Sequence, residues 1–310
     1  MNLRTPKRAD LQSAAIDRSA TPPHVDKDLP LLRFSRRCQR TLFTHEDFFQ
    51  MRPPKKSPFP QKQGNTAPKA GGYYLYGFHA VLAALGNPQR KNKKLLVTGE
   101  NATRPELLPF TGKMPIETCA KQDLERVLPM GAVHQGIALL TSPLEQRDLE
   151  VFLRDAPEHT ALIVLDQVTD PHNVGAILRS SAAFGASAVV VQARHSPEES
   201  GTLAKAASGA LENVPYISVT NITRALEYLK KERFWCLGMD AEGSQNLATL
   251  NIPEKVALVY GAEGDGLRRL TKENCDVLVH VQTSGTFSSL NVSNAVAVGL
   301  YEVNRQKGVA

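Results

Sequence analysis

From residue 161 onward, short apolar segments alternate with segments of helical periodicity, and this alternation constrains the fold more than any other feature. Continuous apolar runs are typical of strands covered by helices on both faces, and strands that alternate with helices indicate βαβ units. Strands are expected at residues 161–165, 188–191, 234–237, 256–260 and 277–281. Helices are expected at residues 174–184, 203–211, 222–231 and 292–305. The sequence therefore predicts an α/β domain with a mainly parallel sheet over residues 161–310.

A smaller α/β unit is expected upstream, over residues 71–141. Apolar residues at helical spacing in 77–85 are followed by Gly86-Asn87-Pro88, which ends the predicted helix. The other expected elements of this unit are a helix near residues 121–128 and strands at residues 94–98 and 136–140. Residues 142–160 are predicted to form a linker and a lead-in helix to the larger domain.

The net charge of +6 comes from the first 70 residues. They carry 14 of the 37 Lys and Arg residues and 6 of the 31 Asp and Glu residues, a balance of +8 that leaves −2 for residues 71–310. They also contain 9 of the 20 prolines, so their composition predicts a basic, disordered arm. Such an arm is either a solubilising tail or an RNA contact, and its aspartates disfavour a mitochondrial transit peptide. The rest of the chain is not generally basic.

Several classes of protein are disfavoured by patterns that the sequence lacks. No apolar run approaches the roughly 20 residues of a membrane helix, and the N-terminus has no apolar block typical of a secretory signal. The 4 cysteines have no close pairing, and the 8 histidines form no pair with metal-ligand spacing. We therefore expect a cytoplasmic protein with reduced thiols, no membrane association and no bound metal.

Three polar segments lie near expected strand ends, where an open parallel sheet binds its ligands. In the first, a turn follows a strand, a helix is expected to open at Asn173, and Arg179 lies six residues on. The second, residues 261–267, is rich in glycine but has neither the Walker nor the G-x-G-x-x-G order. The third leads into the last helix, with Ser289 or Asn291 as an expected N-cap. Taken singly, each segment is also consistent with an ordinary cap or turn.

Together, the three segments resemble the motifs of the SpoU/TrmH family of RNA ribose 2′-O-methyltransferases. Asp170–Arg179 matches D-P-x-N-x-G-x-x-x-R, Gly261–Leu267 matches G-x-E-G-x-G-L, and Ser289–Ser293 matches S-L-N-V-S. The upstream unit is similar, at residues 76–81 and 133–137, to the substrate-binding domain of the rRNA guanosine branch, which resembles RNA-binding ribosomal proteins. The resemblance implies a SPOUT fold with a C-terminal trefoil knot, an RNA-binding upstream domain and a homodimer.

The resemblance also implies S-adenosylmethionine as the cofactor, held against Gly261, Val281 and Leu290 in the C-terminal loops. Val281 and Leu290 are then expected to flank the adenine while main-chain groups contact its edge. Between Val281 and Gly285, the chain has Gln282-Thr283-Ser284 where many relatives have a Pro-Met pair. This departure bears on the detailed shape of the cofactor loop and not on the class of protein.

On the substrate side, the resemblance places Arg179 nearest the reacting ribose 2′-hydroxyl, supplied across the dimer. A guanidinium stays protonated in proteins, so we expect Arg179 to bind the adjacent phosphate and favour the developing alkoxide, and not to act as the base. The side chains expected to orient Arg179 and the ribose are Asn173, Glu263, Ser289 and Asn291. Among these, Glu263 is the candidate proton acceptor.

The activity expected from the resemblance is S-adenosylmethionine-dependent 2′-O-methylation of a guanosine in 23S rRNA. One alternative is a tRNA ribose 2′-O-methyltransferase. A second is a catalytically inactive RNA-binding protein of the same fold, which the combined presence of the motif residues disfavours. A third is another nucleotide-binding enzyme that uses the loop at Gly261, which the absence of phosphate-binding motifs disfavours.

The charge count generates a first prediction, the removal of residues 1–70. We expect the shortened chain to bind RNA more weakly and with a flatter salt dependence, because fewer counterions are released from the phosphates. The check is a titration of an rRNA fragment at several salt concentrations, with the full chain measured in parallel. Equal affinity at every salt concentration would identify the arm as a solubilising tail.

Overall fold

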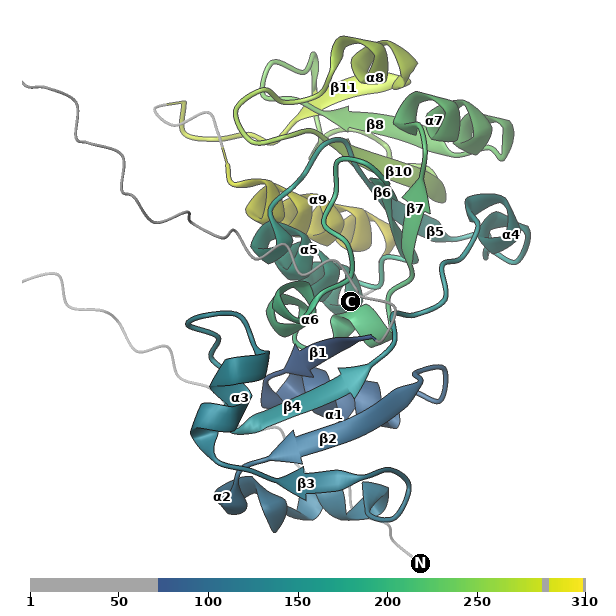
Figure 1. The fold of residues 1–310 in the computed structure, drawn as a ribbon. Coiled ribbons are helices and arrows are strands. Elements are labelled where there is room, and N and C mark those ends of the chain that lie inside the picture. Colours follow the sequence, from purple (N-terminus) through teal and green to yellow (C-terminus); the bar gives the residue numbers. More distant parts are fainter. Residues whose placement is uncertain (1–71, 286–289, 309–310) are drawn as a thin grey trace, which may run out of the picture. The chain divides into compact units, whose positions relative to one another are not determined.

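The computed structural model describes residues 72–285 and 290–308, which contain two β-sheets (Figure 1). The small sheet has the strand order β1-β4-β2-β3. Its strands are β1 (Tyr73–Tyr76), β2 (Asn92–Val97), β3 (Ile116–Thr118) and β4 (Ile137–Thr141). Strand β4 pairs antiparallel with β1 and β2, whereas β2 pairs parallel with β3. The predicted arm, residues 1–70, lies outside the described residues.

Helices cover both faces of the small sheet. They are α1 (Phe78–Gly86), α2 (Gly99–Ala102), α3 (Lys121–Val127) and the 3-10 helix η2 (Pro105–Phe110). Val81 of α1 packs with Leu95 and Leu139 on one face of the sheet. Leu124 of α3 packs with Leu96 on the other face. Alternate residues of each strand thus face two different cores, as the period of two along a strand requires.

The large sheet has seven strands in the order β7-β6-β5-β10-β8-β11-β9. They are β5 (Thr160–Leu165), β6 (Ala188–Gln192), β7 (Tyr216–Val219), β8 (Trp235–Met239), β9 (Gln245–Asn246), β10 (Lys255–Tyr260) and β11 (Val277–His280). Every pair is parallel, and β10 lies between β5 and β8 although it follows both in the chain. The predicted parallel α/β sheet is confirmed.

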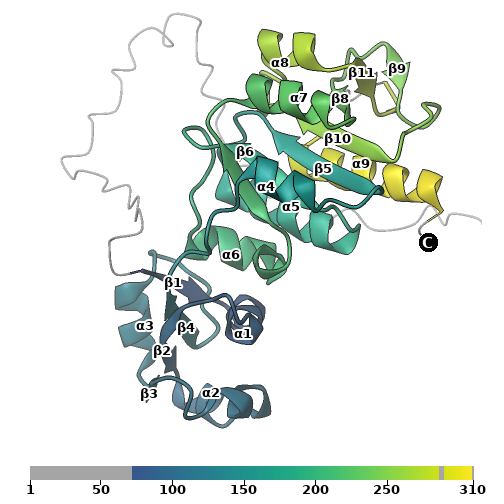
Figure 2. The same ribbon diagram turned by 90° about the vertical axis from the view of Figure 1, so that its right-hand side faces the viewer.

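Two layers of helices enclose the large sheet (Figures 1 and 2). The helices of this part are α4 (Leu149–Arg154), α5 (Pro171–Ala183), α6 (Gly201–Ala207), η3 (Ala210–Glu212), α7 (Ile222–Lys231), α8 (Arg269–Asn274) and α9 (Val292–Lys307). Helices α5, α6 and α9 pack on the face that carries Ile163 and Leu258. Helices α4 and α7 pack on the face that carries Leu162 and Val259. Strands buried on both faces explain the continuous apolar runs in the sequence.

Some expected elements differ from the structure in their bounds. Helix α5 begins at Pro171, not at Asn173, because Asp170 is the N-cap and accepts a hydrogen bond of 3.0 Å from the His172 amide. The helix expected over residues 203–211 ends at Ala207 and is followed by η3. It ends there because the backbone of Ser208 and Gly209 adopts the left-handed conformation. The elements that were not predicted are the strands β1, β3, β7 and β9, the helices α2 and α8 and the 3-10 helix η2.

Two searches of the described residues gave negative findings. None of the helices between residues 72 and 308, apart from the gap at 286–289, is long and apolar enough to cross a bilayer. In the same part of the chain, no three His, Cys, Asp or Glu side chains are grouped to hold a metal ion.

A buried ion-pair network connects the segment before β2 with α6 and η3. The Arg90 side chain is fully buried, and its Nη2 donates to Glu212 Oε1 at 2.7 Å while Nη1 pairs with Glu199. Tyr73 also donates to Glu199, and its buried position and the Glu199 charge raise the pKa of its hydroxyl. Both carboxylates are almost completely buried, so each depends on Arg90 as its counter-ion.

Replacing Arg90 with Met tests how much this network contributes to the stability of the fold. Because the change leaves Glu199 and Glu212 buried without a counter-ion, we expect the free energy of unfolding to fall by about 3–5 kcal/mol. Urea denaturation measures the difference. The matched control is Arg126→Met, since Arg126 forms only an exposed pair with Asp123 and should change stability by less than about 1 kcal/mol. Equal effects of the two changes would contradict the assigned role of Arg90.

Candidate active site

The three predicted polar segments meet at the carboxyl edge of the large sheet. One follows β5 and enters α5, another follows β10, and the third precedes α9. Pairing of Tyr260 with Leu165 ends the β5–β10 ladder, and the Asp166 amide extends it with a hydrogen bond of 2.8 Å to the Tyr260 carbonyl. The loops after β5 and β10 therefore leave the sheet side by side.

The first feature of this edge is a cluster of three side chains, Asn173, Glu263 and Asn291. Glu263 Oε1 accepts hydrogen bonds from Asn173 Nδ2 at 2.9 Å and from Asn291 Nδ2 at 2.6 Å. Asn291 Nδ2 also donates to Asn173 Oδ1 at 3.0 Å. Among the described residues, Glu263 Oε2 has no hydrogen-bond partner, so one oxygen of this exposed carboxylate is available to a further hydrogen-bonding group.

Asn291 also caps a helix. Its Oδ1 accepts from the Ser293 amide at 2.9 Å and from Ser293 Oγ at 2.6 Å, which makes Asn291 the N-cap of α9. The cap holds the side chain in one orientation, and its Nδ2 is thereby directed at Glu263. Asn291 can cap α9 and hold Glu263 at the same time, because the cap uses Oδ1 and the contact with Glu263 uses Nδ2. Ser289, the other expected cap, lies outside the described residues.

A cavity of about 420 Å³ opens beside this cluster and includes all three residues expected to hold a cofactor. Gly261, Val281 and Leu290 line it. Met239, the last residue of β8, and Asp240, the next residue, also line it. Thr283, from the segment that departs from the pattern of relatives, also lines the cavity. Apolar walls with a few convergent polar groups are typical of small-molecule sites.

Asp240 is a polar residue of the cavity that the sequence analysis missed. Burial alone would raise its pKa, but hydrogen bonds from Lys272 and from the Glu242 amide hold the pKa of the Asp240 carboxyl below its ordinary value. The Lys272 Nζ to Asp240 Oδ2 distance is 2.5 Å. Asp240 therefore remains a carboxylate at neutral pH. Its position directly after an apolar strand was the available signal, because that is where ligands bind in a parallel sheet.

Gly261 allows the loop after β10 to fold back on itself. Ala262 and Gly266 exchange two backbone hydrogen bonds, of 3.1 and 3.0 Å. A Cβ at position 261 would lie 2.0 Å from the Gly266 carbonyl carbon and 2.3 Å from the Leu267 amide nitrogen. Only glycine permits this close approach of two backbone segments, which forms one wall of the cavity.

Arg179 is not joined to the cluster within one chain. Its side chain is exposed on α5, and among the described residues it has no hydrogen bond or ion pair. Arg179 lies six residues after Asn173, a separation of about 9 Å along the helix axis. The expectation that Asn173, Glu263 and Asn291 orient Arg179 is therefore not met within a single copy of the chain.

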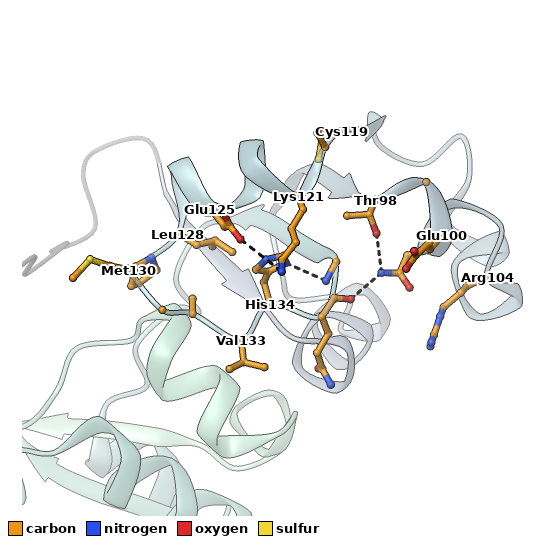
Figure 3. A pocket seen from close by; sticks show the side chains of 18 residues that line it. Thr98, Glu100, Arg104, Cys119, Lys121, Glu125, Leu128, Met130, Val133 and His134 are labelled. Carbon is orange, nitrogen blue, oxygen red and sulfur yellow. Dashed lines mark hydrogen bonds and ion pairs between the residues drawn. The ribbon is translucent and has the colours of Figure 1, made fainter.

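A second, larger cavity lies on the small sheet unit (Figure 3). Its volume is about 1150 Å³, and its walls come from α2, α3 and residues 129–136. Asn101 Nδ2 joins two walls through a hydrogen bond of 2.8 Å to the Gln135 carbonyl. Met130 is fully exposed and Val133 is 70% exposed at its rim. An open cavity with projecting apolar side chains is typical of a surface that contacts a partner.

A parallel sheet with a fixed carboxylate beside a small-molecule cavity at the carboxyl ends of its strands is an arrangement typical of α/β enzymes. A profile described as "SpoU rRNA Methylase family" matches residues 160–301, and one described as "RNA 2'-O ribose methyltransferase substrate binding" matches residues 74–147. The 23S rRNA (guanosine-2'-O-)-methyltransferase RlmB of Salmonella typhi is 40% identical over 244 residues, which cover 75% of this chain and 98% of the relative. The chain belongs to the SpoU rRNA methylase family.

A second curated relative agrees with this assignment, and two solved structures share the fold. RlmB of Neisseria meningitidis is 39% identical over 237 residues, covering 75% of this chain and 95% of that protein. The crystal structure of the SpoU methyltransferase AviRb from Streptomyces viridochromogenes with AdoMet superposes with a TM-score of 0.67 at 22% identity, over 77% of this chain and 91% of that one. The structure of a TrmH-family RNA methyltransferase from Porphyromonas gingivalis superposes with a TM-score of 0.61 at 22% identity. The superposition covers 76% of this chain and 90% of that one. The family resemblance expected from the motifs is confirmed.

The close approach at Gly261 generates a prediction for Gly261→Ala. The added methyl group forces the loop after β10 to move, and we expect a loss of about 1–3 kcal/mol in the free energy of unfolding. Urea denaturation measures it. The matched control is Gly86→Ala, because Gly86 is helical and a Cβ there meets no atom within 4 Å. That change should be neutral or stabilising by up to about 1 kcal/mol. A neutral Gly261→Ala would contradict the packing argument.

Proposed function

We propose that this chain transfers a methyl group from S-adenosylmethionine to the ribose 2′-oxygen of a guanosine in 23S rRNA. The observation that carries the proposal is the carboxylate of Glu263, held by two asparagine amides at the rim of a small-molecule cavity. RlmB relatives of about 40% identity, named for this reaction, support the choice of substrate. An rRNA substrate places the activity in the cytoplasm, where ribosomes are made.

The cofactor site proposed is the 420 Å³ cavity, whose size and lining fit S-adenosylmethionine. Val281 and Leu290 provide apolar contacts for the adenine, and the backbone around Gly261 lies close enough to bond its polar edge. The carboxylate of Asp240 provides a counter-charge or a hydrogen-bond acceptor for the cationic and hydroxyl groups of the cofactor. Bound S-adenosylmethionine supplies a methyl group attached to a positively charged sulfur.

The proposed reaction is an in-line displacement that requires alignment and the removal of one proton. The ribose 2′-oxygen forms a bond to the methyl carbon while the carbon–sulfur bond breaks. The hydroxyl proton passes to Glu263 Oε2, the oxygen without a protein partner among the described residues. Asn173 and Asn291 hold the carboxylate in place, and Ser289 is proposed to complete the site from the adjoining loop.

We propose that Arg179 acts in the site of a second copy. Val298 and Tyr301 are exposed on α9. The Tyr301 ring packs edge-on against the ring of Phe184, which directly follows α5, and the two ring centres are 6.3 Å apart. A homodimer formed through α5 and α9 would bury this apolar surface and bring Arg179 to Glu263 of the other copy. There its permanent charge binds the phosphate next to the reacting ribose and stabilises the developing alkoxide.

The trefoil knot implied by the family is proposed for the C-terminal part of the large sheet. Two observations support it: β10 inserts between β5 and β8, and the last helix α9 returns to pack on α5.

The remaining part of the proposal is that the small sheet unit binds RNA. The exposed side chains of Met130 and Val133 can make apolar contacts with unpaired bases. Lys121 and Arg104, whose guanidinium carbon lies 4.1 Å from the centre of the Phe78 ring, can contact phosphates.

The test of the function uses labelled S-adenosylmethionine and 23S rRNA that lacks 2′-O-methylation. We expect label in a single guanosine ribose, located by nuclease digestion. Arg179→Ala should lower the methylation rate by at least about 100-fold, because an oriented charge at the reacting centre is lost, while cofactor affinity stays unchanged. Label in tRNA alone would contradict the rRNA assignment, and no label in any RNA would indicate an inactive RNA-binding protein.

Mixed dimers distinguish a contribution across the interface from one within a chain. Arg179→Ala and Glu263→Gln are each expected to be nearly inactive. If Arg179 serves the site of the partner copy, a mixed dimer contains one site with both native residues, and mixing the two variants should restore activity. Activity no higher than that of either variant would contradict the proposed arrangement.

A further inference from the structure

A third cavity lies at the carboxyl edge of the large sheet, beyond β6 and β7. It has a volume of about 300 Å³ and shares no lining residue with the proposed cofactor cavity. Its lining residues are Gln192, Asn221, Thr223, Arg268, Arg269 and Leu270. Two of these six carry a positive charge and none carries a negative one, so the cavity is suited to an anion.

The guanidinium of Arg268 is held rigidly at this cavity. Its Nε donates to Asp166 Oδ1 at 2.9 Å, and its Nη2 contacts Asp166 Oδ1 at 2.5 Å and donates to Gln192 Oε1 at 3.0 Å. The Asp166 side chain is completely buried and also accepts from Thr271 Oγ1 at 2.6 Å. A fixed guanidinium loses little conformational entropy when a ligand binds, unlike most surface arginines.

One side of this guanidinium remains available. The Arg268 side chain is 42% exposed, and among the described residues its Nη1 has no acceptor. Asp166 offsets much of the charge of Arg268, so recognition depends on the direction of the Nη1 hydrogens as well as on charge. The neighbouring Arg269 adds a second positive group, although it also pairs with Glu273 at 2.6 Å on the exposed surface.

The opposite wall adds hydrogen-bond donors. Asn221 is the N-cap of α7, and its side chain accepts from the Arg224 amide at 3.1 Å. Within the described residues, the amides of Ile222 and Thr223 have no protein acceptor, and the first turn of this ten-residue helix contains no acidic residue. Thr223, the second residue of α7, lines the same cavity as Arg268. All of these groups favour an oxyanion.

We propose that this cavity binds a backbone phosphate of the RNA substrate, a different phosphate from the one assigned to Arg179. The proposal rests on the proposed function and adds a binding site to it. Arg268 lies five residues after Glu263, a chain length that spans at most about 18 Å. The phosphate would therefore belong to a nucleotide near the reacting ribose and would fix the direction of the strand across the sheet edge.

The test replaces Gln192 with Glu. The new carboxylate keeps the hydrogen bond from Arg268 Nη2 but adds a negative charge to the cavity, so the fold should be retained while a phosphate is repelled. We expect the dissociation constant for a 23S rRNA fragment to rise about tenfold. The salt slope of binding should fall by about 0.7–0.9, the value of one phosphate contact. Methylation at saturating RNA and cofactor affinity should change much less.

The matched control is Gln245→Glu. Gln245 is exposed in β9, at the opposite edge of the sheet, and the same charge change there should leave RNA binding unaltered. A second variant, Thr223→Asp, places the charge on the other wall, where an acidic residue suits the first turn of a helix. If both cavity variants bind RNA like Gln245→Glu, the proposal is overturned. Lack of methylation by the unaltered chain would count against the proposed function alone, because the binding series still decides the cavity.

Discussion

The parallel pairing of β10 with both β5 and β8 is the constraint on which the site depends. The register that places Tyr260 beside Leu165 ends the two central strands at the same level, and the Asp166 amide continues the ladder by one bond. The first turn of α5, which contains Asn173, and the loop that contains Glu263 therefore lie next to each other, although 90 residues separate the two side chains in the chain. Pairing of β10 with β8 on its other side places Asp240 at the proposed cofactor cavity.

Two carboxylates at this edge have opposite surroundings, which suit the different tasks proposed for them. Asp166 is buried and fully engaged by Arg268 and Thr271, so its role is to hold other groups in place. Glu263 is exposed, and one of its oxygens accepts from two amides while the other has no partner in residues 72–285 and 290–308. A carboxylate that must exchange a proton needs such a free oxygen, whereas one that orients a guanidinium needs burial and complete pairing. The loop from β10 to α8 connects both environments, since it contains Glu263 and Arg268.

Much of the fold could be predicted from the sequence, but several contacts could not. The five expected strands and the parallel arrangement follow from continuous apolar runs, which report burial on both faces. Strand β7 was missed because Tyr216–Val219 includes an exposed serine and lies at a sheet edge, where burial is incomplete. Arg90 gave no local signal, because its partners Glu199 and Glu212 lie 109 and 122 residues away. Asp240 had a local signal, its position directly after an apolar strand, but the cavity that it lines is formed by segments far apart in the chain.

The sequence by itself determined the class of fold, the family and the residue types of the site. Those properties are local: apolar runs specify strands, Gly261 permits a tight loop, and the motif residues can be read in order. Only the tertiary structure decided that Asn173 and Asn291 hold Glu263 and that Arg179 stands apart from them in one chain. The physical reason is that hydrogen bonds act over about 3 Å, so they depend on strand order and register, and periodicity along the chain does not specify these.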